Sequence, residues 1–307
     1  MNNLLFLWFL SLLLVGCNGH SAKNNGTVSA TETVPVSDYS RVQESSLKSD
    51  SSRVQESSSE SESSRVSEPS RVSEPISVPE YELPATKDGE LIIRHTGFTL
   101  SYNKSRNTPN WSAWCLTASH TDGTVPRSSK FWADPKVPTS CRVEYYDYKE
   151  SGYDRGHMCP AGDMKWSEQA MHDCFYMSNM CPQTGALNSG AWNGLEKRCR
   201  DWAKKEGRLY IVCGPIYKKG KRRERIGIDH VVHVPDAFFK AVLSLRKGHE
   251  KAVAFYFLND ESQQSYNTAA MSVDEIEAIT GFDLFAALDD SLESRLETNS
   301  DVRVFTK

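Results

Sequence analysis

The chain has 307 residues, of which 36 are Lys or Arg and 40 are Asp or Glu, so its formal net charge at pH 7 is −4. This balance excludes a basic field over the whole chain, and any attraction for nucleic acid must therefore be local. With 38% hydrophobic residues, the chain has enough apolar side chains for one domain with a sizeable core.

Residues 1–17 are typical of an export signal, because the stretch 4–15 is almost wholly apolar yet shorter than a transmembrane helix requires. The stretch is followed by Gly16 and Cys17, and the run Leu14-Val15-Gly16-Cys17 resembles the bacterial lipobox, in which the cysteine is lipidated and becomes the mature N-terminus. The signal departs from the usual pattern because it contains no Lys or Arg, and an ordinary cleaved signal is the alternative. Both interpretations predict export. The first also predicts a lipid anchor at Cys17 on a bacterial cell envelope, on its periplasmic or its surface face.

Residues 18–85 have the composition of a disordered, Ser-rich, acidic tether. Nineteen of these 68 residues are serine, the aromatic residues are limited to Tyr39 and Tyr81, and the net charge is about −5. An imperfect six-residue repeat begins at residues 40, 52, 64 and 70. Because so little apolar surface can be buried, ordering this backbone would not be repaid. As a coil, the segment would span roughly 45 Å, enough to hold a domain clear of a membrane.

Residues 86–307 contain 30 basic and 29 acidic residues, and we expect one α+β domain with a mostly antiparallel sheet. Apolar runs predict strands within 90–102 and at 111–118, 209–216, 226–234, 237–245 and 252–258. A central helix is expected to start at Gly185 and to end before Gly207, because apolar residues recur between them at helical spacing. A short helix is expected after Ser272, which has a capping-box spacing, and another over 282–296.

One block of the sequence contains the parts needed to hydrolyse a phosphodiester. It begins Asp154-Arg155-Gly156-His157, and a histidine between an arginine and a glycine-rich turn suits a general base because its ordinary pKa lies near neutrality. Further on, Asn188 offers a neutral oxygen, which Mg²⁺ accepts as a ligand while keeping most of its waters. A base, an arginine and an oxygen ligand together can activate water and stabilise a charged phosphate.

These residues resemble the signature of the DNA/RNA non-specific endonucleases, which are ββα-metal (His-Me finger) nucleases. The family pattern Asp-Arg-Gly-His is met from Asp154 to His157, with Gly162 in the last place of the block. The later Asn-x-x-Pro-Gln is met from Asn179 to Gln183, and Leu-Asn-x-Gly-x-Trp-x-x-Leu-Glu is met from Leu187 to Glu196. The resemblance spans about residues 90–285 and implies a ββα-metal finger in the active site.

The resemblance also implies a role for each candidate residue. His157 would deprotonate the attacking water, Arg155 would clamp the phosphate, and Asn188 would be the only direct protein ligand of Mg²⁺, for which Mn²⁺ can substitute. Glu196, on the same helix as Asn188, would hold waters of the metal. Arg127, in the polar loop 121–138, is the candidate for a further active-site arginine. Asp154 and Asn179 match positions that brace the loop.

Simpler interpretations exist for the same residues. His157 could be a structural histidine, Arg155 a surface ion-pair partner, Asn188 a plain helix N-cap, and Glu196 part of a solvated helix face. The basic run Lys218–Arg225 is either a solvated hairpin tip or a local grip on phosphates.

Eight cysteines require an explanation. With Cys17 assigned to lipid, seven are left, and outside the cytoplasm up to three disulfides and one free thiol are expected. Cys199 and Cys213 are one candidate pair, since a short turn joins the helix and the strand that contain them. Two alternatives are a zinc site made of Cys159, Cys174, Cys181 and His172, and a nucleophilic pair of Cys159 with His157.

The N-terminal pattern predicts an exported, lipid-anchored protein. The resemblance implies an Mg²⁺-dependent nuclease that cuts DNA and RNA without base specificity and leaves 5′-phosphate ends. The alternative is a catalytically inactive lipoprotein that binds nucleic acid. A homodimer, which occurs in parts of the family, is left open.

Overall fold

The computed structural model describes residues 79–220 and 224–306, all of which belong to one structural unit. The export signal, the lipobox and nearly all of the acidic tether lie outside these residues, so those expectations stay predictions. Within the described ranges, no helix combines the length and the apolar character needed to cross a bilayer.

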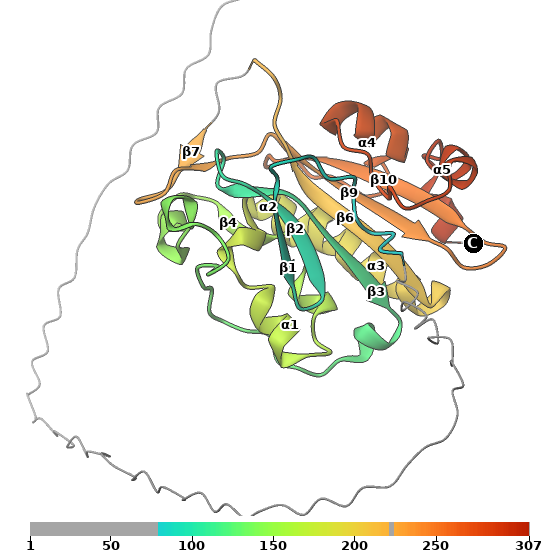
Figure 1. Cartoon of the computed structure of the whole chain (residues 1–307), viewed down its shortest axis with the longest axis horizontal. Coiled ribbons are helices and arrows are strands. Elements are labelled where there is room, and N and C mark those ends of the chain that lie inside the picture. Colours follow the sequence, from blue (N-terminus) through green and yellow to red (C-terminus); the bar gives the residue numbers. More distant parts are fainter. Residues whose placement is uncertain (1–78, 221–223, 307) are drawn as a thin grey trace, which may run out of the picture. The chain divides into compact units, whose positions relative to one another are not determined.

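A central sheet organises the domain (Figure 1). Its strands follow the order β1-β2-β3-β6-β9-β10-β11, and every neighbouring pair is antiparallel. The strands are β1 (Leu91–His95), β2 (Phe98–Asn103), β3 (Thr108–Thr117), β6 (Arg208–Ile216), β9 (Ala237–Ser244), β10 (Lys251–Leu258) and β11 (Ala270–Met271). This confirms the predicted α+β class with a mostly antiparallel sheet.

Both faces of the sheet are buried, as β6 illustrates. Leu209 and Ile211 pack into one hydrophobic cluster, whereas Tyr210 and Val212 pack into another. Successive side chains of a strand point to opposite faces, so a strand covered on both sides is apolar throughout. This burial explains the continuous apolar run that predicted the strand.

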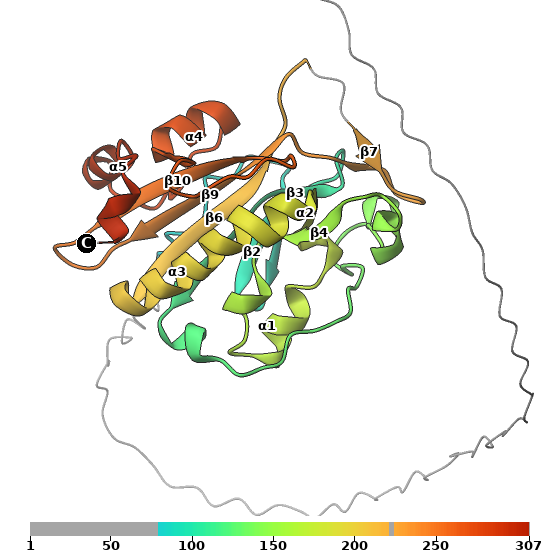
Figure 2. The same cartoon turned by 180° about the vertical axis from the view of Figure 1, so that it is seen from behind.

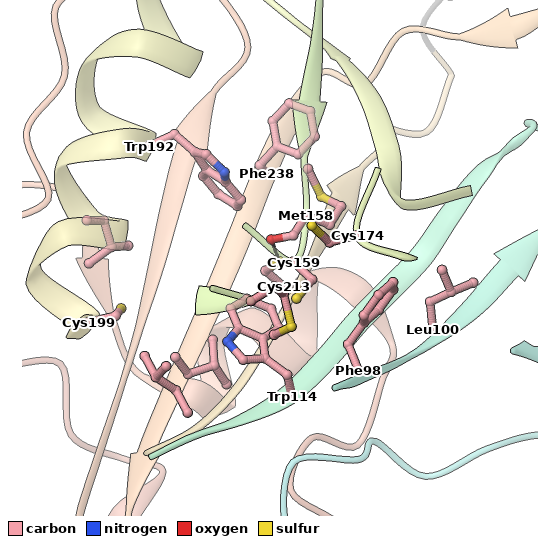
Figure 3. Close-up of a cluster of buried hydrophobic side chains, with 14 of the residues drawn as sticks. Phe98, Leu100, Trp114, Met158, Cys159, Cys174, Trp192, Cys199, Cys213 and Phe238 are labelled. Atoms are coloured by element: carbon pink, nitrogen blue, oxygen red, sulfur yellow. Dashed lines mark hydrogen bonds between the residues drawn. The ribbon is translucent and has the colours of Figure 1, made fainter. Parts of the chain in front are cut away.

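Helices cover the two faces separately (Figures 1 and 2). One face lies against α3 (Asn193–Glu206), and Figure 3 shows Trp192 beside Phe238 of β9, with Trp114 of β3 below them. The other face lies against α4 (Val273–Thr280) and α5 (Asp290–Leu296). The capping box predicted at Ser272 is present, because its side chain and that of Glu275 each accept a backbone N–H.

The remaining elements are short and lie mostly in the connections. They are α1 (Glu168–Asp173), α2 (Gly185–Leu187), the hairpin strands β4 (Asp154–His157) and β5 (Met180–Gln183), and the hairpin strands β7 (Arg225–Ile226) and β8 (Val232–His233). Single helical turns are 3-10 segments at Ser119–Asp122, Thr139–Cys141, Tyr145–Tyr148, Ala161–Asp163, Met177–Asn179 and Val302–Phe305, and a π-helical turn spans Asn188–Trp192.

Two expected elements are shorter than predicted. The strand expected at 226–234 is a small hairpin, because the carboxylate of Asp147 accepts the backbone N–H groups of residues 228–230 and so bends the chain there. The helix expected over 282–296 is limited to α5. Phe285 has a φ of 54°, a left-handed conformation that a helix cannot contain.

The end of the expected tether is part of the domain. The ring of Tyr81 packs edge-on against Tyr210, with 5.4 Å between the ring centroids, and Leu83 packs on the same cluster. The carboxylate of Glu80 pairs with Arg94 on β1. Ordered packing therefore begins by residue 79, earlier than the boundary at 86 that the composition indicated, because these few apolar side chains have a sheet face to cover.

The expected disulfides are not supported. All seven cysteines in the described residues are free thiols, and six of them are buried. Burial raises the pKa of both Cys199 and Cys213 to about 12, so neither thiol ionises readily, and Cys213 Sγ donates to the carbonyl of Met158 instead. These cysteines behave as small apolar core residues.

Candidate active site

The site is built on the β4–β5 hairpin, whose first strand is the Asp-Arg-Gly-His block. At the centre of β4, a Cβ on Gly156 would overlap the side-chain amide of Gln183 on β5. The close approach of the two strands therefore requires glycine between Arg155 and His157. The hairpin holds these two side chains at fixed positions on an ordered strand.

The helical segment after β5 begins at α2, and its cap is Thr184. The Thr184 hydroxyl accepts the N–H of Leu187 and donates to the carbonyl of Asp260, while its backbone N–H donates to Asn259. Asn188 follows α2 in helical conformation, with φ −59° and ψ −50°. The interpretation of Asn188 as a plain N-cap is therefore wrong.

The predicted central helix is not continuous. The π-helical turn Asn188–Trp192 contains Gly190 at φ −90° and ψ −110°, and α3 starts only after it. The apolar stripe of α3 is buried as predicted, and Gly207 ends the helix with a φ of 84°. Because this π-helical turn lies between Asn188 and Glu196, the relative positions of their side chains cannot be calculated from the geometry of one straight helix. Strand, strand and helix together form the expected ββα finger.

His157 ends β4 and is buried, with 7% of its surface exposed. Its Nε2 is buried without a hydrogen-bond partner in the described structure, while the ring also hydrogen-bonds the backbone at Arg155. Burial, reinforced by the charge of Arg127, lowers the pKa of His157 to about 3. Its imidazole is therefore neutral at physiological pH, with one ring nitrogen free to accept a proton.

Two phenylalanines hold the arginines next to this histidine. Phe131 and Phe175 pack against each other, with 5.1 Å between their centroids, and both rings contact His157. The guanidinium of Arg155 lies 4.6 Å above Phe131, and that of Arg127 lies 5.0 Å above Phe175. Cation–π contact thus places two positive charges around one buried imidazole. The structure brings Arg127, which sequence reasoning assigned only by its neighbourhood, to the site.

Asn188 is half-buried, and its amide nitrogen donates to Asp154 at 2.9 Å. That bond orients the amide, and no described residue donates to the oxygen, which stays available as a ligand. A neutral amide oxygen with carboxylates nearby is the donor set of a hard divalent cation such as Mg²⁺ or Mn²⁺. The residues present therefore fit such an ion.

Glu196, on the first turn of α3, lies half-buried within reach of the charge of Arg127. Burial raises the pKa of Glu196 to about 7, although the nearby ammonium of Lys240 opposes this rise. The carboxylate is therefore not part of a fully solvated helix face. It belongs to the same electrostatic environment as His157 and Arg127.

Sequence reasoning missed the charged groups beneath Glu196. Lys240 on β9 is almost fully buried, and its Nζ lies 4.2 Å from the ring centre of Trp192 and 5.2 Å from that of Trp114. Burial opposes its charge, yet its pKa is raised overall by neighbours that include Glu196 and Asp163. The signal for it was a single lysine in the otherwise apolar run Ala-Phe-Phe-Lys-Ala-Val-Leu.

Phe175 and Arg200 were missed for different reasons. Phe175 lies outside the quoted motifs, and only its contacts show that it supports Arg127 and His157. Arg200 comes one helical turn after Glu196, and its guanidinium donates to the buried carboxylate of Asp163 at 2.8 Å. The i, i+4 spacing of an acidic and a basic residue was visible, but it is also common on solvated helices.

Asn179 braces the hairpin, as expected. Its amide nitrogen donates to the carbonyls of Cys159 and Cys174, and its oxygen accepts from the N–H of Cys159 and the hydroxyl of Ser112. Cys159 is fully buried, and burial raises its pKa well above the usual value, which excludes it as a nucleophile paired with His157. In the described ranges these cysteines and His172 do not come together as a metal group, so the zinc alternative is not supported.

The basic run Lys218–Arg225 is described only in part, since residues 221–223 lie outside the described residues. Its flanks contact the loop that leads into β4: Glu224 accepts the hydroxyl of Tyr153 at 2.8 Å, and Asp229 accepts that of Tyr146 at 2.8 Å. The choice between a solvated tip and a phosphate grip stays open.

Comparisons with known proteins agree with this geometry. Residues 78–291 match the family model described as DNA/RNA non-specific endonuclease. A nuclease of Nostoc sp. is 32% identical over 227 residues, which cover 70% of this chain and 80% of that protein. The mitochondrial nuclease EXOG of Xenopus laevis is 38% identical over 184 residues, covering 57% of this chain and 51% of the relative.

The chain thus spans about half the length of the Xenopus laevis nuclease. It likewise covers 49% of the mitochondrial nuclease EXOG of Danio rerio. Among solved structures, that of an EndoG/EndoGI complex aligns with a TM-score of 0.63 at 28% identity, over 68% of this chain and 90% of the other. The family-model match over residues 78–291 includes both the central sheet and the ββα finger. The chain therefore belongs to the DNA/RNA non-specific endonuclease family, whose members are divalent-metal-dependent nucleases.

Proposed function

We propose that this protein is an exported, Mg²⁺-dependent endonuclease that hydrolyses phosphodiester bonds of DNA and RNA and leaves 5′-phosphate ends. The observation that carries the proposal is the neutral, buried imidazole of His157. Its Nε2 has no partner, and its ring contacts two phenylalanines that each stack with an arginine. The positive charge suits an anionic substrate such as a phosphodiester. The neutral base suits a water nucleophile, which must lose a proton as it attacks.

In this proposal, His157 Nε2 accepts the proton of the water that attacks phosphorus. The backbone hydrogen bond at Arg155 fixes the orientation of the ring, and the phenylalanine pair excludes water from its sides. Since the folded site disfavours the imidazolium, the base is unprotonated before each turnover. The proton must then leave to solvent once the substrate phosphate has reacted.

Arg127 and Arg155 hold the phosphate and offset the charge that develops on it. The guanidinium of Arg155 is further fixed by donation to the carbonyl of Tyr145 at 3.1 Å. Arginine suits this role because its planar fork matches two phosphate oxygens at once. Contacts to phosphate oxygens carry no base information, so two phosphate-holding arginines are in line with the proposed cleavage without base specificity.

Asn188 would hold the divalent cation through its amide oxygen, with Asp154 orienting the amide and Glu196 hydrogen-bonding the waters around the ion. When bound there, the ion supplies Lewis-acid stabilisation of charge on the phosphate and the leaving 3′ oxygen. Mg²⁺ is the proposed ion, and Mn²⁺ accepts the same oxygen donors. Because the pKa of Glu196 is about 7, the positive charge of a bound ion would favour the ionised carboxylate, which accepts hydrogen bonds from water.

Export and lipid anchoring through Cys17 form part of the proposal. Their support is the apolar stretch at 4–15, the lipobox-like Leu-Val-Gly-Cys, and the polar composition of the segment that follows. A nearly neutral domain at the end of such a tether could reach polymers outside the membrane. We leave the oligomeric state open.

The test is digestion of plasmid DNA and of RNA by the purified protein, with Mg²⁺ and with EDTA. We expect both substrates to be cut only with Mg²⁺, and His157→Ala to lose roughly 10³-fold in rate while still binding DNA. His249→Ala, which changes an exposed histidine in the β9–β10 turn, should cut like the wild type. Binding without any cleavage by the wild type would favour an inactive nucleic-acid-binding lipoprotein. Near-normal cleavage by His157→Ala would refute the assignment of the base.

A further inference from the structure

A second group of oxygen ligands lies on the opposite face of the sheet from the candidate active site (Figures 1 and 2). Asp274 and Glu277 are on α4, and Glu297 follows α5. Each contributes a carboxylate oxygen, and these oxygens all lie within 4.8 Å of one another. The backbone connects the two helices at the same point, where the N–H of Asp274 donates to the carbonyl of Glu297 at 3.3 Å.

Glu297 is the unusual member of this cluster. Its side chain is 1% exposed, and its Oε1 is buried with no hydrogen-bond partner. A buried carboxylate without a partner is costly, and a folded protein normally compensates it with a proton, a basic side chain or a metal ion. The exposed Asp274 leaves the cluster open to solvent on one side, so an ion has a way in.

No basic side chain fills this role in the described part of the chain. The charged groups with the largest effect on Glu297 are all carboxylates, namely those of Glu277, Glu293, Asp274 and Asp283. Lys87, which lies at the end of α4, donates to the carbonyl of Gly281 at 3.4 Å instead. The cluster therefore concentrates acidic side chains at one point.

We propose that Asp274, Glu277 and Glu297 bind a structural Ca²⁺ that ties α4 to the end of α5. Ca²⁺ accepts six to eight oxygens at about 2.4 Å, so two of its ligands can be up to about 4.8 Å apart, and waters complete an irregular shell. The side chain of Glu277 also accepts the N–H of Leu284 at 2.6 Å. The loop between the two helices thus holds the carboxylate of Glu277 in place. Asp283 and Glu293 add negative charge around the ion.

This site does not depend on the proposed nuclease function, and it is separate from the ion that Asn188 would hold. The full chain should be freed of metal with a chelator, and its melting temperature measured with added CaCl₂. An Asn188→Ala background removes binding at the other site. With Ca²⁺ at about 100 times its dissociation constant, we expect the melting temperature to rise by roughly 5 °C or more.

Two variants distinguish ion binding from other causes. Glu297→Gln should leave the metal-free protein folded, because the amide has nearly the shape of the carboxyl group, and should abolish the response to Ca²⁺. Asp274→Asn changes an exposed ligand and should weaken the response without endangering the fold. The matched control Asp290→Asn, an exposed carboxylate of α5 outside the three ligands, should respond like the wild type.

The same measurements can overturn the proposal. A wild-type melting temperature that is unchanged by 10 mM CaCl₂, roughly ten times the dissociation constants of the weakest protein Ca²⁺ sites, would show that no Ca²⁺ binds. In that case a melting temperature that falls from pH 6 to pH 9, and a Glu297→Gln variant without this fall, would identify a proton as the compensating cation. An equal Ca²⁺ response in Glu297→Gln would place the ion elsewhere.

Discussion

The rings of Phe131 and Phe175 both contact His157. These surroundings shift the pKa of the imidazole far from the ordinary value of a histidine. The residue type and its neighbours Arg155 and Gly156 were enough to predict a base from the sequence. Its depressed pKa was not predictable, because burial and the charge of Arg127 both come from the loop 121–138 and from the segment around Phe175. Lys240 could not be assigned for the same reason, since its partners lie on other elements.

The pKa of His157 gives a stability prediction with a definite sign. Its pKa is about 3 in the folded protein and about 6.5 when unfolded, so between these values the unfolded state binds more protons. The stability of the wild type relative to His157→Ala should therefore fall as the pH decreases from about 6.5, by up to about 1.4 kcal/mol per pH unit. Denaturant unfolding of both proteins from pH 7 to pH 4 measures the difference.

His157→Asn is the matched control for this measurement. Neither asparagine nor alanine titrates in this range, so both variants should give the same slope against the wild type. A wild-type advantage that is independent of pH would mean that the imidazole titrates alike in the folded and unfolded chains, and it would contradict the burial described above.

At the scale of elements, the finger consists of the β4–β5 hairpin followed by α2, the π-helical turn and α3. Helix periodicity predicted the apolar face of α3 and its end at Gly207 correctly. The π-helical turn at Asn188–Trp192 escaped prediction, because its distortion is imposed from outside the segment. Asn259 and Asp260 hold Thr184, and the indole of Trp192 donates to the carbonyl of His157 at 3.1 Å.

A pair of glycine substitutions tests how closely the finger is packed. Gly156→Ala would drive its Cβ into Gln183 and should destabilise the protein by roughly 1–3 kcal/mol, with loss of activity. Gly194→Ala, in α3 with open space around the new Cβ, should instead be neutral or stabilise by up to about 1 kcal/mol. Thermal unfolding and nuclease assays of both variants give the comparison. If Gly156→Ala and Gly194→Ala were equally stable, β4 and β5 would be able to move apart without a loss of stability.

At the scale of the whole molecule, the apolar runs and their alternation were sufficient to predict an α+β domain with an antiparallel sheet. The order of the strands in the sheet was not predictable, since long connections separate β3 from β6 and β6 from β9, although these strands are neighbours in the sheet. The start of the domain was also placed too late, because Tyr81 and Leu83 look isolated in a polar segment until the sheet face beneath them is known.

The proposed anchor can be tested on the complete protein. Cys17→Ser should move the protein from the membrane fraction to the soluble fraction of an expressing bacterium, because the residue that would be lipidated is lost. The nuclease activity of the purified variant should equal that of the wild type, since the domain is unchanged. Variant protein that still sediments with membranes would contradict the lipobox interpretation.

If the protein is exported as proposed, the seven thiols of the domain have a consequence for its lifetime. Six are buried, so in an oxidising medium the folded state is itself the barrier that keeps sulfur away from oxidants and from other cysteines. A molecule that unfolds briefly exposes all of them at once, and random cross-links then prevent its return. The durability of such an enzyme is set by how rarely it opens rather than by the equilibrium between folded and unfolded chains.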